Sequence, residues 1–94
     1  MKNERIGLIG FGAIGKEVYK KISKKIINGY DIVGIFSYDI ESKNISKKIK
    51  CISFEELLKK KPNIIIKAAS VEACKDYAEK ILRNKIDFIC LSGC

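Results

Sequence analysis

Residues 5–15 read Arg-Ile-Gly-Leu-Ile-Gly-Phe-Gly-Ala-Ile-Gly, and this stretch decides the fold. An apolar strand comes first, and a lysine-rich amphipathic helix begins directly after the glycines. Gly10, Gly12 and Gly15 have the Gly-x-Gly-x-x-Gly spacing of dinucleotide-binding turns, although glycine-rich turns also occur for structural reasons alone. We expect the first glycine to turn the chain off the strand, the second to let a pyrophosphate approach, and the third to let the helix pack closely. The helix N-terminus would then present N–H groups to the phosphates.

Length and composition restrict the class of protein. The chain has 94 residues, which allow one domain with a modest core. It contains no apolar run long enough to span a membrane and no signal-peptide pattern at its start, so we expect a soluble, cytoplasmic protein without a membrane partner. The four cysteines lack Cys-x-x-Cys spacing and there is no histidine, so we expect no metal site and reduced, mostly buried thiols. The net charge of +8 comes mainly from lysines spread along the chain, which favours a solvated lysine surface over a nucleic-acid site.

The first half of the chain predicts a strand–helix–strand unit. The strand covers residues 6–9, and the next strand covers residues 32–36. Between them, the inward stripe of the helix is expected to consist of Ile14, Val18, Ile22 and Ile26. Asn28-Gly29 is typical of a helix C-terminal stop. The unit has the expected length of about 30 residues.

The second half begins with a less regular segment. Residues 37–50 predict either a short helix or a loop, and residues 50–52 predict a brief third strand. Ser53 and Glu56 match the capping box of a short helix. Pro62 then forces the chain to restart.

The last part of the chain predicts one more strand, helix and strand. The fourth strand covers residues 63–69, and Ser70 can cap the helix that follows. The side chains expected to lie inward on that helix are Val71, Cys74, Ala78, Ile81 and Leu82. The fifth strand covers residues 86–91 and is apolar on both faces. We expect this edge to remain exposed and to favour association with other chains.

Alternation of strands and helices predicts a parallel sheet with right-handed crossovers. We therefore expect one Rossmann-like α/β domain over residues 1–94, with about five strands in the order 3-2-1-4-5 and helices on both faces. In such sheets the ligand lies beyond the carboxyl ends of the strands. The candidate dinucleotide-binding residues are Gly10, Phe11, Gly12, Ala13, Ile14, Gly15, Ser37, Asp39, Ala69 and Ser70.

The end of the second strand bears on the choice of cofactor. Sites that prefer NAD place an acidic residue there to bind the ribose hydroxyls. That position falls near Ser37, and the first carboxylate is Asp39. Ser37 leaves room for a 2′-phosphate that Lys43 could reach, so both NAD and NADP stay open. Lys67, at the end of the fourth strand, either extends its ammonium group to solvent or adds positive charge near the cofactor.

Two segments resemble the L-aspartate dehydrogenase family and, more loosely, the NAD-binding half of homoserine dehydrogenases. They are residues 7–16, Gly-Leu-Ile-Gly-Phe-Gly-Ala-Ile-Gly-Lys, and residues 68–82, Ala-Ala-Ser-Val-Glu-Ala-Cys-Lys-Asp-Tyr-Ala-Glu-Lys-Ile-Leu. The second segment is the more specific one, and the family usually has an acid where Lys67 stands. The resemblance implies an oxidoreductase that uses NAD or NADP to oxidise L-aspartate to iminosuccinate and feeds NAD biosynthesis.

The resemblance also implies that the catalytic histidine and the substrate-binding residues lie in a C-terminal half, beyond a Ser-Gly-Ala-Ile-Gly-Gly segment that these residues lack. We therefore assign no catalytic residue, and we expect a Rossmann domain that is cut short before the catalytic domain and is inactive alone. Three interpretations stay open. They are an incomplete dehydrogenase domain that keeps its nucleotide-binding turn, a stand-alone nucleotide-binding or redox-sensing module, and one half of a split enzyme. The expected partners are a dinucleotide and either a separate catalytic domain or further copies of the chain.

Overall fold

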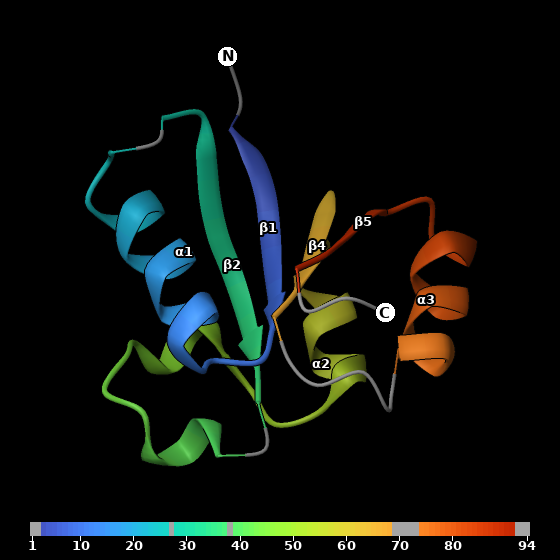
Figure 1. The fold of residues 1–94 in the computed structure, drawn as a ribbon. Helices are drawn as coiled ribbons and strands as arrows, with labels where there is room; N and C mark the ends of the chain where they lie inside the picture. Colours follow the sequence, from blue (N-terminus) through green and yellow to red (C-terminus); the bar gives the residue numbers. More distant parts are fainter. Residues whose placement is uncertain (1–2, 27, 38, 69–73, 92–94) are drawn as a thin grey trace.

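A five-stranded parallel sheet forms the centre of the computed structural model, which describes residues 3–26, 28–37, 39–68 and 74–91 (Figure 1). The strands are β1 (Glu4–Ile9), β2 (Tyr30–Phe36), β3 (Lys50–Cys51), β4 (Ile64–Lys67) and β5 (Asp87–Cys90). Their order is β3-β2-β1-β4-β5, and every neighbouring pair is parallel. The predicted strand order 3-2-1-4-5 is therefore confirmed.

Helices cover both faces of the sheet, as predicted (Figure 1). The helices are α1 (Ala13–Ser23), α2 (Phe54–Lys59) and α3 (Cys74–Arg83), with short 3-10 turns η1 (Ile40–Ser42) and η2 (Lys47–Ile49). Two separate apolar clusters fill the two faces. One contains Ile22 of α1, and the other contains Leu57 of α2 and Ile81 of α3. The packing therefore has the layered arrangement that parallel sheets require.

Two facing glycines receive α2. Gly7 of β1 and Gly34 of β2 are paired across the strands. A Cβ added at Gly7 would lie 2.9 Å from Cδ1 of Leu57, and one added at Gly34 would lie 2.8 Å from it. The Leu57 side chain is completely buried above this pair. The short helix therefore docks at a place where the sheet has no side chains, which explains two glycines outside the predicted turn.

The first helix ends earlier than the sequence predicted. It ends at Ser23 rather than at Asn28-Gly29, because Lys25 adopts the left-handed conformation with φ 61°. The amides of Lys25 and Ile26 donate to the carbonyls of Ile22 and Lys21, which is the hydrogen-bond pattern of a Schellman motif. Ile26 therefore lies outside the helix and is exposed, so its predicted place in the inward stripe is wrong.

The other two helices also end at a lysine with positive φ. Lys61 after α2 has φ 54°, and Lys85 after α3 has φ 57°. Glycine, not lysine, favours this conformation, so these helix ends could not be predicted from the residue type. On α3 itself, Ile81 is buried as predicted, whereas Leu82 is 66% exposed and its inward assignment is wrong. The predicted cap at Ser70 lies outside the described residues, as do residue 71 and the side chain at position 74.

The segment between β2 and β3 is a loop with two 3-10 turns rather than a helix. Ile40 is fully buried and anchors the first turn, and Ser46 caps the second by accepting a hydrogen bond from the Lys48 amide. The predicted capping box is confirmed at Ser53, whose Oγ accepts from the Glu56 amide at 3.2 Å. The carboxylate of Glu56 accepts from the backbone N–H of residue 52 instead of from the cap residue.

Apolar side chains at β5 are partly bare. Ile89 of β5 is 45% exposed and Leu91, which follows the strand, is 44% exposed, in agreement with the expected exposure of apolar residues at this end of the sheet. On the α1 side of the sheet, Ile64, Ile66 and Ile89 line a shallow apolar groove of about 290 Å³. None of the helices described is long and apolar enough to cross a lipid bilayer.

The docking of α2 gives a first prediction. Replacing Leu57 by Ala should lower the free energy of unfolding by about 3 kcal/mol, because the fully buried side chain leaves a cavity over the two glycines. The matched Leu82→Ala variant removes an exposed side chain and should change stability by less than about 0.5 kcal/mol. Urea denaturation followed by circular dichroism measures both. Equal losses in the two variants would contradict the packing described.

Candidate nucleotide-binding site

The backbone and the packing of the protein require glycine at two positions of the turn between β1 and α1, Gly10 and Gly15. Gly10 has φ 94°, and its amide donates to the Phe36 carbonyl at 2.7 Å, which joins the turn to the end of β2 (Figure 1). Gly15 lies where α1 crosses this turn. A Cβ at Gly15 would be 2.6 Å from the carbonyl oxygen of Gly10, a contact that only a shift of the backbone could relieve. Both predicted structural roles fit the observed geometry.

Gly12 differs from these two glycines. An added Cβ would meet no atom of the described chain within 4 Å, and the residue has φ −81°, which any amino acid adopts. Neither the packing nor the backbone of the described residues therefore requires glycine at this position. A ligand that approaches the main chain from solvent does give such a reason.

The start of α1 has the electrostatics of an anion site. No side chain among the described residues caps its first turn, and no acidic residue lies in that turn. The first helical bond runs from the Lys16 amide to the Gly12 carbonyl at 2.9 Å. The preceding amides point outward along the positive end of the helix dipole.

The remaining residues of the turn divide into buried and exposed ones. Phe11 is buried and packs edge-to-face on Tyr19, with ring centroids 5.6 Å apart. Ala13 is exposed. Ile14 was expected on the inward stripe of α1, but it is about half exposed beside the turn. The inward assignment of Ile14 is therefore wrong. Its contact with the cofactor stays a prediction, and the exposed side chain is accessible to a ligand.

A hydrogen-bonded carboxylate follows the end of β2. Ser37 Oγ donates to Asp39 Oδ1 at 2.5 Å, and Lys43 Nζ lies 3.1 Å from Asp39 Oδ2. These partners, first the hydroxyl of Ser37 and then Lys43, lower the pKa of Asp39 below its ordinary value. The Ser42 hydroxyl also donates to the Asp39 carbonyl at 2.8 Å. The carboxylate is thus ionised and held in place in the loop that follows β2, the strand to which the glycine turn is hydrogen-bonded.

A groove lies between α1 and this loop. It has a volume of about 670 Å³ and is lined on one side by Ala13 and Lys16 and on the other by Ser42 and Lys43. Sequence reasoning found Asp39 and Lys43 separately but missed that they form a pair. Their spacing of four residues, which favours ion pairs, could have signalled it.

Lys67 lies at the carboxyl end of β4, between β1 and β5. It pairs in register with Ile9 of β1 and Cys90 of β5, and its side chain is 1% exposed. The interpretation that it extends its ammonium group to solvent is therefore wrong. Ala69 and Ser70, predicted to contact the cofactor at this edge, lie outside the described residues.

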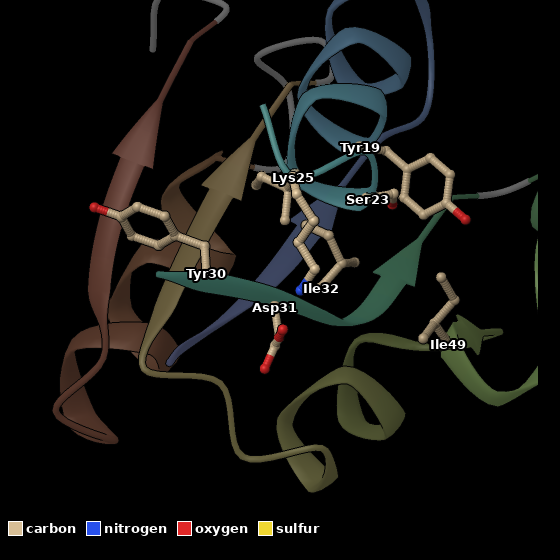
Figure 2. Close-up of a pocket in the computed structure, with 8 residues that line it drawn as sticks. Tyr19, Ser23, Lys25, Tyr30, Asp31, Ile32 and Ile49 are labelled. Carbon is tan, nitrogen blue, oxygen red and sulfur yellow. The ribbon is translucent and has the colours of Figure 1, made fainter. Parts of the chain in front are cut away.

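A second hollow, of about 380 Å³, lies at the other end of α1 (Figure 2). The hollow is lined by Tyr19 and Ser23 of α1 and by Asp31 and Ile32 of β2. Lys25 extends from the end of the helix toward β2 (Figure 2). This hollow is at the amino end of β2. Ligands of open parallel sheets lie beyond the carboxyl ends, so the glycine turn is the better candidate.

The cysteines offer no exposed nucleophile in the described part of the chain. Cys51 is a free, fully buried thiol, and burial raises its pKa above the ordinary value although Lys60 opposes the shift. Cys90 is disulfide-bonded. The prediction of reduced thiols therefore fits Cys51 and is wrong for Cys90. Among the residues described, no three metal-binding side chains come together.

The parallel sheet, its strand order and the glycine turn with an uncapped helix behind it define the class of dinucleotide-binding Rossmann-type domains. The sequence model of the family "Homoserine dehydrogenase, NAD binding domain" matches residues 10–93. The chain belongs to this family of NAD-binding domains.

The curated relatives agree with the resemblance carried by the motifs. The chain is 39% identical over 87 residues to the L-aspartate dehydrogenase of Archaeoglobus fulgidus, and the match covers 93% of this chain and 34% of the relative. It is 30% identical over 92 residues to the L-aspartate dehydrogenase of Methanocaldococcus jannaschii, covering 94% of this chain and 34% of that protein. The chain thus spans about a third of the length of these relatives.

Solved structures with lower identity share the fold. Dihydrodipicolinate reductase from Paenisporosarcina sp. TG-14 superposes with a TM-score of 0.80 at 15% identity, covering 94% of this chain and 37% of that one. The Rex-family repressor RSP superposes with a TM-score of 0.71 at 17% identity, covering 98% and 47%. At these identities the likeness shows the architecture alone.

The buried thiol gives a second prediction. In the unfolded chain Cys51 ionises near pH 8.5, whereas in the folded protein its pKa is higher. The stability associated with the neutral thiol is therefore present below about pH 8.5 and declines as the pH rises above it. Urea denaturation of the parent and of Cys51→Ala at pH 7.5 and 9.5 tests this. The parent should lose more stability than the variant over that range, and an equal loss would contradict the burial of the thiol.

Proposed function

We propose that residues 10–15 bind the pyrophosphate of NAD or NADP, and that Ser37 and Asp39 face the adenosine ribose. The observation that supports this most directly is Gly12, the glycine of the turn for which the described fold has no use of its own. The uncapped amides at the start of α1 supply donors to phosphate oxygens. The backbone of Phe11, Ala13 and Ile14 completes the turn.

We also propose that the domain serves an oxidoreductase of the L-aspartate dehydrogenase type, located in the cytoplasm. The support comes from the relatives, which are named L-aspartate dehydrogenases. Proton transfer needs a base within hydrogen-bond reach of the substrate, and the chain has no histidine to provide one. In this proposal, residues corresponding to the other two thirds of the relatives supply the base and bind the substrate. Ala69 and Ser70 belong to the proposed site by their place after β4.

The glycine turn gives a third prediction, which compares two substitutions three residues apart. Gly12→Ala places a methyl group in open space, so the fold should keep its stability to within about 0.5 kcal/mol. The same methyl group should weaken NADH binding at least about tenfold by displacing the pyrophosphate from the backbone donors. Gly15→Ala should instead lower the free energy of unfolding by about 2–3 kcal/mol, because its Cβ collides with a backbone oxygen.

Fluorescence titration with NADH and NADPH, together with urea denaturation, separates these effects. If a folded parent binds neither nucleotide, the proposed site is wrong. If Gly12→Ala binds as tightly as the parent, the turn does not hold the pyrophosphate.

The proposal that the base and the substrate-binding groups lie outside these 94 residues gives a fourth prediction. The 94-residue chain, mixed with L-aspartate and NAD or NADP, should show no reduction of the nicotinamide, because the proposed base and substrate-binding groups lie outside it. Absorbance at the wavelength of the reduced nicotinamide ring measures this. Turnover above the protein-free blank would show that these 94 residues suffice for catalysis.

A further inference from the structure

The carboxyl end of β5 is fixed by a disulfide. Cys90, the last residue of this strand, is disulfide-bonded and half-buried. Among the described strands, β5 has four residues and pairs with β4 alone, because it stands at the edge of the sheet. An edge strand has hydrogen bonds on one side only, so its end separates from the sheet more easily than the end of a central strand. The disulfide therefore fixes a part of the sheet that backbone pairing alone holds weakly.

A buried lysine lies directly beside Cys90. Lys67 of β4 is its partner in the parallel register, so the two side chains point to the same face of the sheet. Ile65, two residues before Lys67, belongs to the apolar cluster under α2 and α3, so this is the face that those helices cover. Lys67 is 1% exposed, and burial of an ammonium group costs free energy even where the group is paired. Separation of the end of β5 would give water access to Lys67, so this lysine favours separation wherever the disulfide does not prevent it.

Backbone hydrogen bonds connect the end of β5 to the glycine turn. The Leu91 amide donates to the Lys67 carbonyl at 2.9 Å. The next amide along β4, that of Ala68, donates to the Ile9 carbonyl at 2.8 Å. The residue after Ile9 is Gly10, whose amide donates to the end of β2 at 2.7 Å. A displacement of the end of β5 can therefore reach the turn through adjacent residues that are directly bonded to one another.

We propose that the disulfide of Cys90 is a thiol–disulfide switch that controls the affinity of the proposed dinucleotide site, on which this inference rests. Disulfides of cytoplasmic proteins are mostly transient, catalytic or redox-sensing, which favours a switch over a permanent crosslink at the proposed location. In the oxidised form the end of β5 stays paired with β4, and the turn is held in place for the pyrophosphate. In the reduced form the end of β5 separates, Lys67 is hydrated, and the turn loses part of its support.

The reductant in this switch is a dithiol. One thiolate of the dithiol attacks a sulfur of the protein disulfide and breaks the S–S bond, which forms a mixed disulfide and releases one cysteine. The second thiolate of the dithiol then displaces the other cysteine and closes a disulfide within the reductant. Two electrons and two protons pass from the dithiol to the protein, whose two sulfurs become thiols.

The test compares the NADH affinity of the protein before and after reduction by dithiothreitol, by fluorescence titration. Reduction should weaken NADH binding at least about fivefold, the lower end of common coupling between two sites. Cys90→Ser should bind NADH with the affinity of the reduced protein in either buffer. Cys51→Ala is the matched control, since it removes a cysteine that is free, and its affinity should respond to reduction as that of the parent does.

Thermodynamic linkage gives a reciprocal measurement. If the oxidised protein binds NADH more tightly, NADH must favour the oxidised protein by the same factor. The ratio of reduced to oxidised dithiothreitol at which half of the disulfide is lost should therefore rise at least about fivefold at saturating NADH. Mass spectrometry after alkylation of the thiols measures that ratio. Lys67→Met removes the buried charge, so it should bring the affinities of the oxidised and reduced protein to within about twofold of each other.

The outcomes separate the switch from the site itself. If all four cysteines are alkylated in protein prepared without reductant, or if reduction leaves the NADH affinity unchanged, the switch is wrong and the dinucleotide site stands. If Lys67→Met keeps the full effect of reduction, the role of the buried lysine is wrong. If neither form binds nucleotide, the dinucleotide site is wrong, and hydrogen exchange of the peptide that contains the turn decides the switch alone. Reduction should accelerate that exchange, and unchanged exchange would overturn the switch as well. Circular dichroism shows whether each variant is folded.

Discussion

The contact between α1 and the turn that precedes it is the constraint on which the site depends. At Gly15 the helix lies so close to the Gly10 carbonyl that no Cβ fits between them. This approach brings the first turn of α1 over the carboxyl edge of β1, where the Gly10 amide is also tied to β2. A side chain at residue 15 would push the start of α1 away from the carboxyl edge of β1. The uncapped amides therefore face the place where an anion can bind because two glycines permit the approach.

On the opposite face of the sheet, glycines again allow a helix to pack closely, but no binding site is formed there by this contact. Gly7 and Gly34 remove side chains beneath Leu57, so α2 comes close to the strands despite having only six residues. A short helix has few apolar side chains to bury, and close packing gives each of them more contacts with the sheet. Short helices thus cover both faces of the five-stranded sheet, although the α1 side of β4 and β5 stays partly bare.

The sequence predicts the architecture because the signals for it are local and repeated. Alternating apolar runs and amphipathic segments restrict the topology to a parallel sheet with right-handed crossovers, and the glycine spacing locates the first turn. Helix ends are different. Lys25 and Lys85 adopt positive φ because the chain must reverse there, and a lysine gives no sign of that. The burial of Lys67 was missed for a related reason, since it depends on the strands on either side and not on its neighbours in sequence.

The candidate site could be predicted in its glycines but not in its electrostatics. The net charge of +8 attracts anions in general, and it attracts NADP more strongly than NAD because the 2′-phosphate adds negative charge. This attraction is screened by salt over about 8–10 Å, whereas a group in direct contact with the ribose is screened much less. In the folded protein, Ser37 and Lys43 hold the carboxylate of Asp39, and the loop holds its backbone. Only the folded loop brings these three side chains together, which is why composition and motif spacing could name the residues without giving their arrangement.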